Sequence, residues 1–112
     1  MWVNQFDYRV TTKAVKQLLK QYATIRRLAI NSNHPFHKQA RQELECIKTT
    51  LKDFDDPYLS IIKMCYLSDY PKKDEFVASH IGYGKTQYYK MKRDALLMFA
   101  ERYSNQELLK AK

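Results

Sequence analysis

The stretch IGYGKTQYYKMKR, residues 81–93, decides how the chain folds, because its glycines fit two different motifs. The tripeptide GKT at residues 84–86 is also the ending of a P-loop, the phosphate-binding turn of many nucleotide hydrolases. The same stretch has the spacing of the turn in a helix-turn-helix. The first motif predicts a strand followed by a helix, and the second predicts two helices joined by a tight turn.

The P-loop interpretation fails at its first element. A P-loop requires glycine five residues before Gly84, and this chain has Ser79 there. The preceding segment DEFVASHIG has the apolar spacing of a short amphipathic helix, with four residues expected to face inward: Phe76, Val77, Ala78 and Ile81. A chain of 112 residues is also too short for a complete nucleotide-binding α/β sheet. Bound ATP is therefore not expected.

The helix-turn-helix interpretation accounts for more positions. Gly82 is the turn residue, since a positive φ costs little only without a Cβ. Ala78, four residues earlier, is small where two helices cross. Tyr88 and Met91 fall where the second helix must face the core, and the turn is flanked by apolar Val77, Ile81 and Tyr83.

This motif predicts a DNA-binding surface. We expect base contacts in the major groove from the start of the second helix, namely Lys85, Thr86, Gln87 and Lys90; glutamine can pair with adenine, and lysine with guanine or phosphate. Phosphate contacts are expected from Lys72, Lys73, Tyr89, Lys92 and Arg93. Gly82 and Gly84 form the turn, with Gly84 as the N-cap. The alternative is a solvated basic helix end.

The rest of the chain predicts an all-α fold. Only two Gly and three Pro interrupt it, which favours a few long helices. Five helices are expected: one capped by Thr11 or Thr12 and reaching residue 29, one at 36–54, a nearly all-apolar central helix at 55–67 capped by Asp55 or Asp56, one at 72–80, and one at 85–103.

These helices predict one compact domain with four parts. An arm at 1–10 is tacked onto the domain by Trp2, Val3, Phe6 and Tyr8. A helical hairpin follows at 11–54, then a helix-turn-helix region at 55–103 and a tail at 104–112. The last helix continues as an apolar stripe that packs either on the hairpin or on a second copy in a homodimer: Ala95, Leu96, Met98, Phe99 and Tyr103.

The charge distribution indicates a polyanionic partner. The net charge is +8, with +5 in residues 1–31, −1 in residues 32–70 and +4 in residues 71–112. This segregation favours nucleic acid ahead of a membrane surface. With no signal peptide and no apolar run of about 18 residues, the sequence predicts a cytoplasmic protein without a membrane span.

Chemistry-bearing residues are sparse. Cys46 and Cys65, even with His34 and His37, lack the spacing of zinc ligands, so buried free thiols are expected. No Ser/His/Asp arrangement or pair of carboxylates suggests a catalytic centre. The sequence therefore predicts neither an enzyme nor a cofactor.

Three segments together resemble the ArpU family of phage-encoded transcriptional regulators: DYRVTTKAVKQLLKQYATIRRLA at 7–29, the acid-Pro start of the central helix, and VASHIGYGKTQYYKMKRDALLMFAERY at 77–103. The resemblance spans roughly Asp7 to Tyr103. It implies a helix-turn-helix like that of sigma-factor region 4, control of late phage genes, contact with RNA polymerase, and no catalytic residues. Many family members have Ser where this chain has Gly84.

Two alternatives use the same features. The chain could be the DNA-recognition subunit of a phage packaging terminase, which would assemble into a ring. It could also be a protein-interaction module bound to host RNA polymerase, with its basic face against an acidic partner. A regulator that binds double-stranded DNA is the leading hypothesis.

Overall fold

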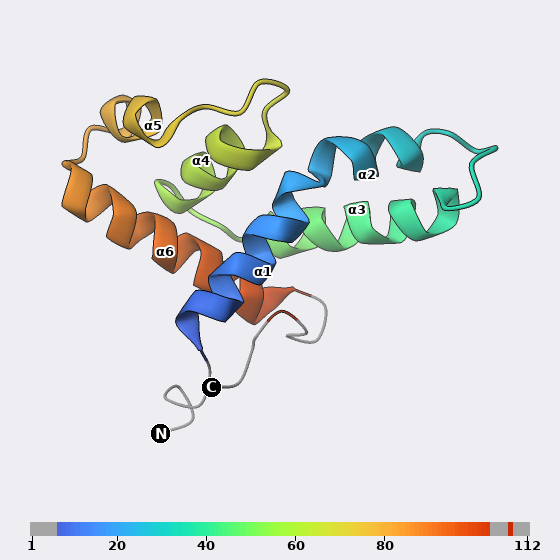
Figure 1. Ribbon diagram of the computed structural model, residues 1–112, viewed down its shortest axis with the longest axis horizontal. Coiled ribbons are helices and arrows are strands. Elements are labelled where there is room, and N and C mark those ends of the chain that lie inside the picture. Colours follow the sequence, from blue (N-terminus) through green and yellow to red (C-terminus); the bar gives the residue numbers. More distant parts are fainter. Residues whose placement is uncertain (1–6, 104–107, 109–112) are drawn as a thin grey trace.

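The computed structural model describes residues 7–103 and residue 108. That part of the chain is helical and contains no strand, so the predicted all-α class is confirmed. The described residues form six α-helices and one π-helix, however, instead of the five helices expected. Figure 1 shows α5 and the start of α6 at one end of the molecule and α2 and α3 extending to the other. The elements are α1 (Tyr8–Lys20), α2 (Tyr22–Ala29), α3 (His37–Leu51), α4 (Tyr58–Ile62), the π-helix η2 (Lys63–Leu67), α5 (Asp74–Ile81) and α6 (Lys85–Arg102).

Helix α1 begins earlier than the sequence predicted. Its N-cap is Asp7, whose carboxylate accepts hydrogen bonds from the backbone N–H groups of Arg9 at 2.9 Å and Val10 at 3.1 Å. The expected cap at Thr11 or Thr12 is therefore wrong, because a better acceptor lies one turn upstream. Residues 8–10 belong to the helix rather than to an arm. Trp2, Val3 and Phe6 lie outside the described residues.

The single helix expected up to residue 29 is divided at Gln21, whose φ of −90° and ψ of 2° leave the helical region. The reason lies in the burial pattern. The four-residue spacing of Thr11, Val15 and Leu19 would next reach Ala23 and Arg27, which are exposed, whereas α2 buries Ile25 and Ala29. The break turns α2 toward α3, which it packs along, while α1 packs across α6 (Figure 1). The helical pair is thus α2 and α3 alone.

Helix α6 lies at the centre of the described chain, a place that the sequence assigned to residues 55–67. It packs on α1, α3, α4 and α5, and its second half buries five residues: Ala95, Leu96, Leu97, Phe99 and Ala100. The predicted stripe on this helix belongs to the core that α6 forms with α1, α3 and α4 of the same chain, with Met98 only partly buried. The segment expected as one central helix divides into α4 and η2. The N-cap of α4 is Pro57 rather than the expected Asp55 or Asp56, although the Asp56 carboxylate accepts hydrogen bonds from Ser60 N–H and Oγ–H.

The turn between α5 and α6 has the predicted geometry at Gly82. Its φ is +81° and its ψ is 24°, and its N–H donates to the carbonyls of Ala78 and Ser79. The N–H of Tyr83 also donates to the carbonyl of Ala78, at 3.2 Å. Gly84 is the N-cap of α6, but its φ of −66° suits any residue and no side chain caps the helix there. Only Gly82 therefore requires glycine.

The two glycines should respond oppositely to substitution. Gly82→Ala should lower the free energy of unfolding by about 1–2 kcal/mol, since a Cβ is strained at positive φ. Gly84→Ser should raise it by about 0.5–1 kcal/mol, because a Cβ there meets nothing within 4 Å and serine adds a cap. Urea unfolding of both variants measures this, and a loss for Gly84→Ser would contradict the assigned N-cap.

Candidate nucleic-acid interface

Helices α5 and α6 are attached to the body of the molecule through a small apolar cluster. Its buried members come from α4, η2, α5 and α6: Ile61, Cys65, Val77, Tyr88 and Met91. Tyr88 and Met91 thus face inward, as the spacing predicted, with 0% and 5% of their surfaces exposed. The first turns of α6 are held from one side only, which leaves the opposite side to solvent.

A polar network fixes the start of α5 against α6. The Asp74 Oδ1 atom accepts hydrogen bonds from the Tyr88 hydroxyl and from the Lys92 Nζ, each at 2.7 Å. The Tyr88 hydroxyl also lies 3.3 Å from the Sγ of Cys65, and the Lys92 Nζ lies over the ring of Tyr66 at 5.5 Å from its centre. The Sγ of Cys65 lies 3.8 Å from the same Oδ1 atom, so this one carboxylate links α5, α6 and η2, and Lys92 balances its charge.

The pKa values of this network follow from burial and hydrogen bonding. Partial burial would raise the pKa of Asp74, but hydrogen bonds from Lys92 and Tyr88 outweigh it and hold that pKa below its usual value. Burial would lower the pKa of Lys92, but the hydrogen bond to Asp74 outweighs it and raises that pKa. Burial also raises the pKa values of Tyr88 and Cys65. Cys65 thus remains a neutral thiol at neutral pH.

Lys92 was predicted to contact DNA phosphate, and the structure gives it a different role. Only 14% of its side chain is exposed, and its ammonium group is engaged by Asp74. At roughly 100° per residue, Lys92 and Tyr88 are one turn apart on the same side of α6, so the core-facing side reaches Lys92. We therefore assign Lys92 to the internal network.

The remaining predicted residues on α6 form an exposed surface. Lys85, Thr86, Gln87, Tyr89 and Lys90 are all exposed, within the first two turns of the helix. The side chain of Arg93 is 56% exposed. By helical geometry Thr86, Tyr89, Lys90 and Arg93 point away from the core, while Gln87 lies on one flank and Lys85 on the other. The Tyr83 side chain is exposed as well, rather than packed beside the turn.

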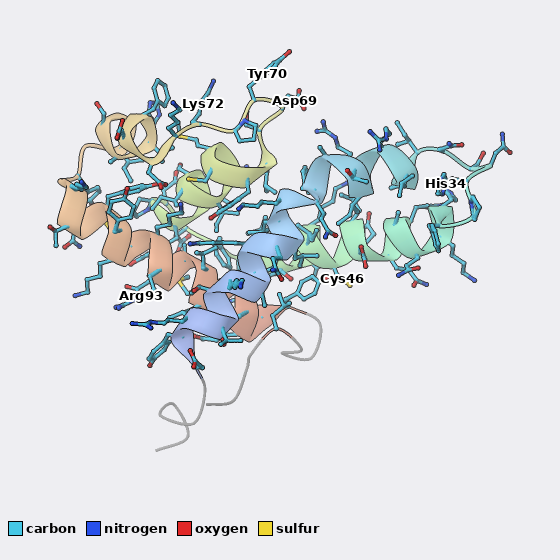
Figure 2. All side chains as sticks on the ribbon, viewed as in Figure 1. His34, Cys46, Asp69, Tyr70, Lys72 and Arg93 are labelled. Atoms are coloured by element: carbon cyan, nitrogen blue, oxygen red, sulfur yellow. The ribbon has the colours of Figure 1, made fainter. Side chains whose placement is uncertain are left out.

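Lys72 and Lys73 precede α5 instead of lying inside it. Both are exposed, and Lys73 is the N-cap, with an extended backbone. The Nζ of Lys72 lies over the ring of Phe76, 5.8 Å from its centre. Phe76 was expected to face inward, but it is 54% exposed, because Val77 takes the buried position of this short helix. Figure 2 shows Lys72 beside α5 and Arg93 on the other side of α6.

The described residues contain neither the fold of a phosphate-binding loop nor a group of potential metal ligands. The segment before the turn, Asp74–Ile81, is a helix and not a strand, which excludes the strand-to-helix turn of a P-loop. Within the described residues no three His, Cys, Asp or Glu side chains are grouped to hold a metal ion. Cys46 and Cys65 are free thiols; Cys65 is buried as expected, but Cys46 is only half-buried, on α3. No helix in the described part of the chain is long and apolar enough to cross a bilayer.

Comparison of the chain with models of known families, with curated proteins and with solved structures gives no match.

The sequence did not reveal the role of Asp74. One signal was present: Tyr88 and Lys92 are four residues apart on α6, so both can reach a single carboxylate. The sequence spacing does not give the angle between α5 and α6, and it is this angle that brings Asp74 close to Tyr88 and Lys92.

Asp74→Asn tests this network. The change removes the charge that Lys92 and Tyr88 contact, and we expect the free energy of unfolding at pH 7 to fall by about 1–3 kcal/mol. A carboxylate with a lowered pKa stabilises the fold above its unfolded pKa and loses that effect as the pH falls through the lowered value. The difference between wild type and variant should therefore shrink in acid below the usual pKa of 3.8.

Asp69→Asn is the matched control, because Asp69 pairs with Arg26 at an exposed site where both side chains are solvated. Denaturant unfolding from pH 2.5 to 7 should show no comparable loss for this variant. Equal effects of the two substitutions would contradict a structural role for Asp74.

Proposed function

We propose that this protein binds double-stranded DNA in a sequence-specific manner and regulates transcription. In this proposal α5, the Gly82 turn and α6 act as a helix-turn-helix, with α6 entering the major groove. The observation that carries the proposal is the exposure of the first two turns of α6. Three predicted groove-facing residues, Lys85, Thr86 and Gln87, are exposed there in succession, while Tyr88 and Met91 anchor the helix in the core. The net charge of +8 supports a polyanionic partner.

The proposed roles follow from side-chain chemistry and position. Lys85, Thr86, Gln87 and Lys90 contact base edges, and Gln87 can donate to and accept from adenine. The groups assigned to phosphates are exposed: Lys72 and Lys73 before α5, and Tyr89 and Arg93 on the solvent-facing side of α6. Lys92 positions the helix through its ion pair with Asp74, so it is not among the residues proposed to bind DNA phosphates.

The resemblance to the ArpU family extends the proposal to regulation of late phage genes in the cytoplasm of a bacterial host. Activation would then involve contact with RNA polymerase. Helices α2 and α3 extend away from α5 and the start of α6 (Figure 1), so they can meet a polymerase while α6 is on DNA.

The proposal predicts a divided response to two substitutions, once a preferred site has been selected from a pool of random duplexes. Gln87→Ala should weaken binding to that site by about 1–3 kcal/mol and relax the choice of one base. Arg93→Ala should weaken binding to all duplexes alike and flatten the dependence of log K on log salt by about one unit. Fluorescence anisotropy at four or five salt concentrations measures both effects.

Lys38→Ala is the control, since Lys38 is an exposed base on α3, away from the proposed interface. It should change neither site preference nor salt dependence to a comparable degree. Failure of wild-type protein to enrich any sequence from the pool would overturn the proposal.

A further inference from the structure

Helix α1 carries all its bases on one flank. Arg9, Lys13, Lys16 and Lys20 fall within an arc of about 60° on a helical wheel. The buried side, made of Thr11, Val15 and Leu19, points elsewhere, and no base lies on the other flank. Solubility does not require the bases to lie on one flank, so the one-sided arrangement indicates a binding surface.

This flank borders a hollow shared with α5 and α6. The hollow has a volume of about 410 Å³ and is lined by Lys16 and Lys20 from α1, by Lys72, Lys73 and Asp74 at the start of α5, and by Tyr89 and Lys92 from α6. Counting Glu75, five lysines and two carboxylates line it, an excess of three positive charges. One of the two carboxylates, Asp74, is already engaged by Lys92.

Apart from Lys92, the lysines of this hollow have no ion-pair partner in the described part of the chain. Among the described residues no carboxylate lies within salt-bridge distance of Lys16, Lys20, Lys72 or Lys73. Clustered like charges repel one another and create a positive potential that an external anion relieves. The hollow is therefore suited to an anionic ligand.

The hollow is continuous with the proposed groove-facing surface. Tyr89 lines it and lies one turn after Lys85 on α6, so a duplex with α6 in its groove has a backbone strand beside Tyr89. On the same flank of α1, Arg9 lines a second hollow together with Arg93 of α6. From Arg9 to Lys20 the flank is roughly 16 Å long, enough to follow several phosphates spaced about 3.4 Å apart along the duplex axis.

We propose that the basic flank of α1, through Lys16 and Lys20, binds the DNA backbone beside the groove entered by α6, with the phosphates in the hollow formed with Lys72 and Lys73. The proposal rests on the proposed function and adds a second element to its interface. The ligand is the phosphodiester backbone of double-stranded DNA, so the contact is independent of base sequence.

The test compares two double variants that lose the same charge. Lys16→Ala/Lys20→Ala removes the proposed contacts, and Lys38→Ala/Arg41→Ala removes two exposed bases from α3. Dissociation constants for a selected duplex and a random duplex are measured by anisotropy from 50 to about 200 mM salt. Thermal unfolding of both variants confirms that each is folded, and alanine favours helix at all four positions.

The α1 variant should flatten the salt dependence by about two units on both duplexes, and the α3 variant by much less. Equal salt dependences for the two variants would overturn the α1 contact. If Gln87→Ala still relaxed base choice in that case, the proposed function would stand without the α1 contact. Absence of DNA binding by the wild-type protein would overturn both. A loss confined to the selected duplex would also count against a backbone contact.

Discussion

The hydrogen bonds that join Asp74 to Tyr88 and Lys92 are the constraint on which the α5–α6 geometry depends. They connect the first residue of α5 to the core-facing side of α6, while Gly82 connects the other end of α5 to the start of α6. Because α5 is joined to α6 at both of its ends, α6 cannot rotate relative to α5 without breaking the hydrogen bonds to Asp74 or straining the turn at Gly82. The exposed side of α6 is therefore fixed in direction, which the proposed DNA-reading role requires.

The same constraint separates side chains that look alike in the sequence. Lys90, Lys92 and Arg93 are close neighbours and all basic. Lys92 is on the core-facing side and balances Asp74, whereas Lys90 and Arg93 are on the solvent side. A neutral residue at position 92 would leave the Asp74 charge without its cation, so this lysine serves the fold, and its neighbours remain available to a ligand.

The sequence predicted the features that depend on local geometry. The all-α class, the start of α6, the positive φ of Gly82 and the burial of Tyr88 and Met91 all follow from spacing and from glycine chemistry. Features that depend on contacts between distant segments were missed. The division at Gln21 arises because α1 and α2 have different partners, and the Asp74 network arises from the angle between two helices. Neither partner choice nor angle is contained in a local pattern.

Phe76 and Leu97 show that burial is hard to predict from sequence: the first was expected to be buried and is exposed, and the second is buried without having been expected to be. Phe76 is apolar and was expected to be inside, but α5 is too short to bury more than Val77 fully. Leu97 was not included in the predicted stripe, but it is buried because α6 is covered on several sides by its neighbours. Burial at these positions is set by how many elements surround a helix, which hydrophobic periodicity does not encode.

The most direct measurement is a map of backbone amide chemical shifts while a selected duplex is added to the protein. The proposed interface predicts that the perturbed amides cluster in residues 72–73 and 85–93, with further shifts along α1 near Lys16 and Lys20, while α2 and the outer face of α3 remain unchanged. Perturbations centred on α2 and α3, or none at saturating DNA, would contradict the claim that the start of α6 is the surface that meets DNA.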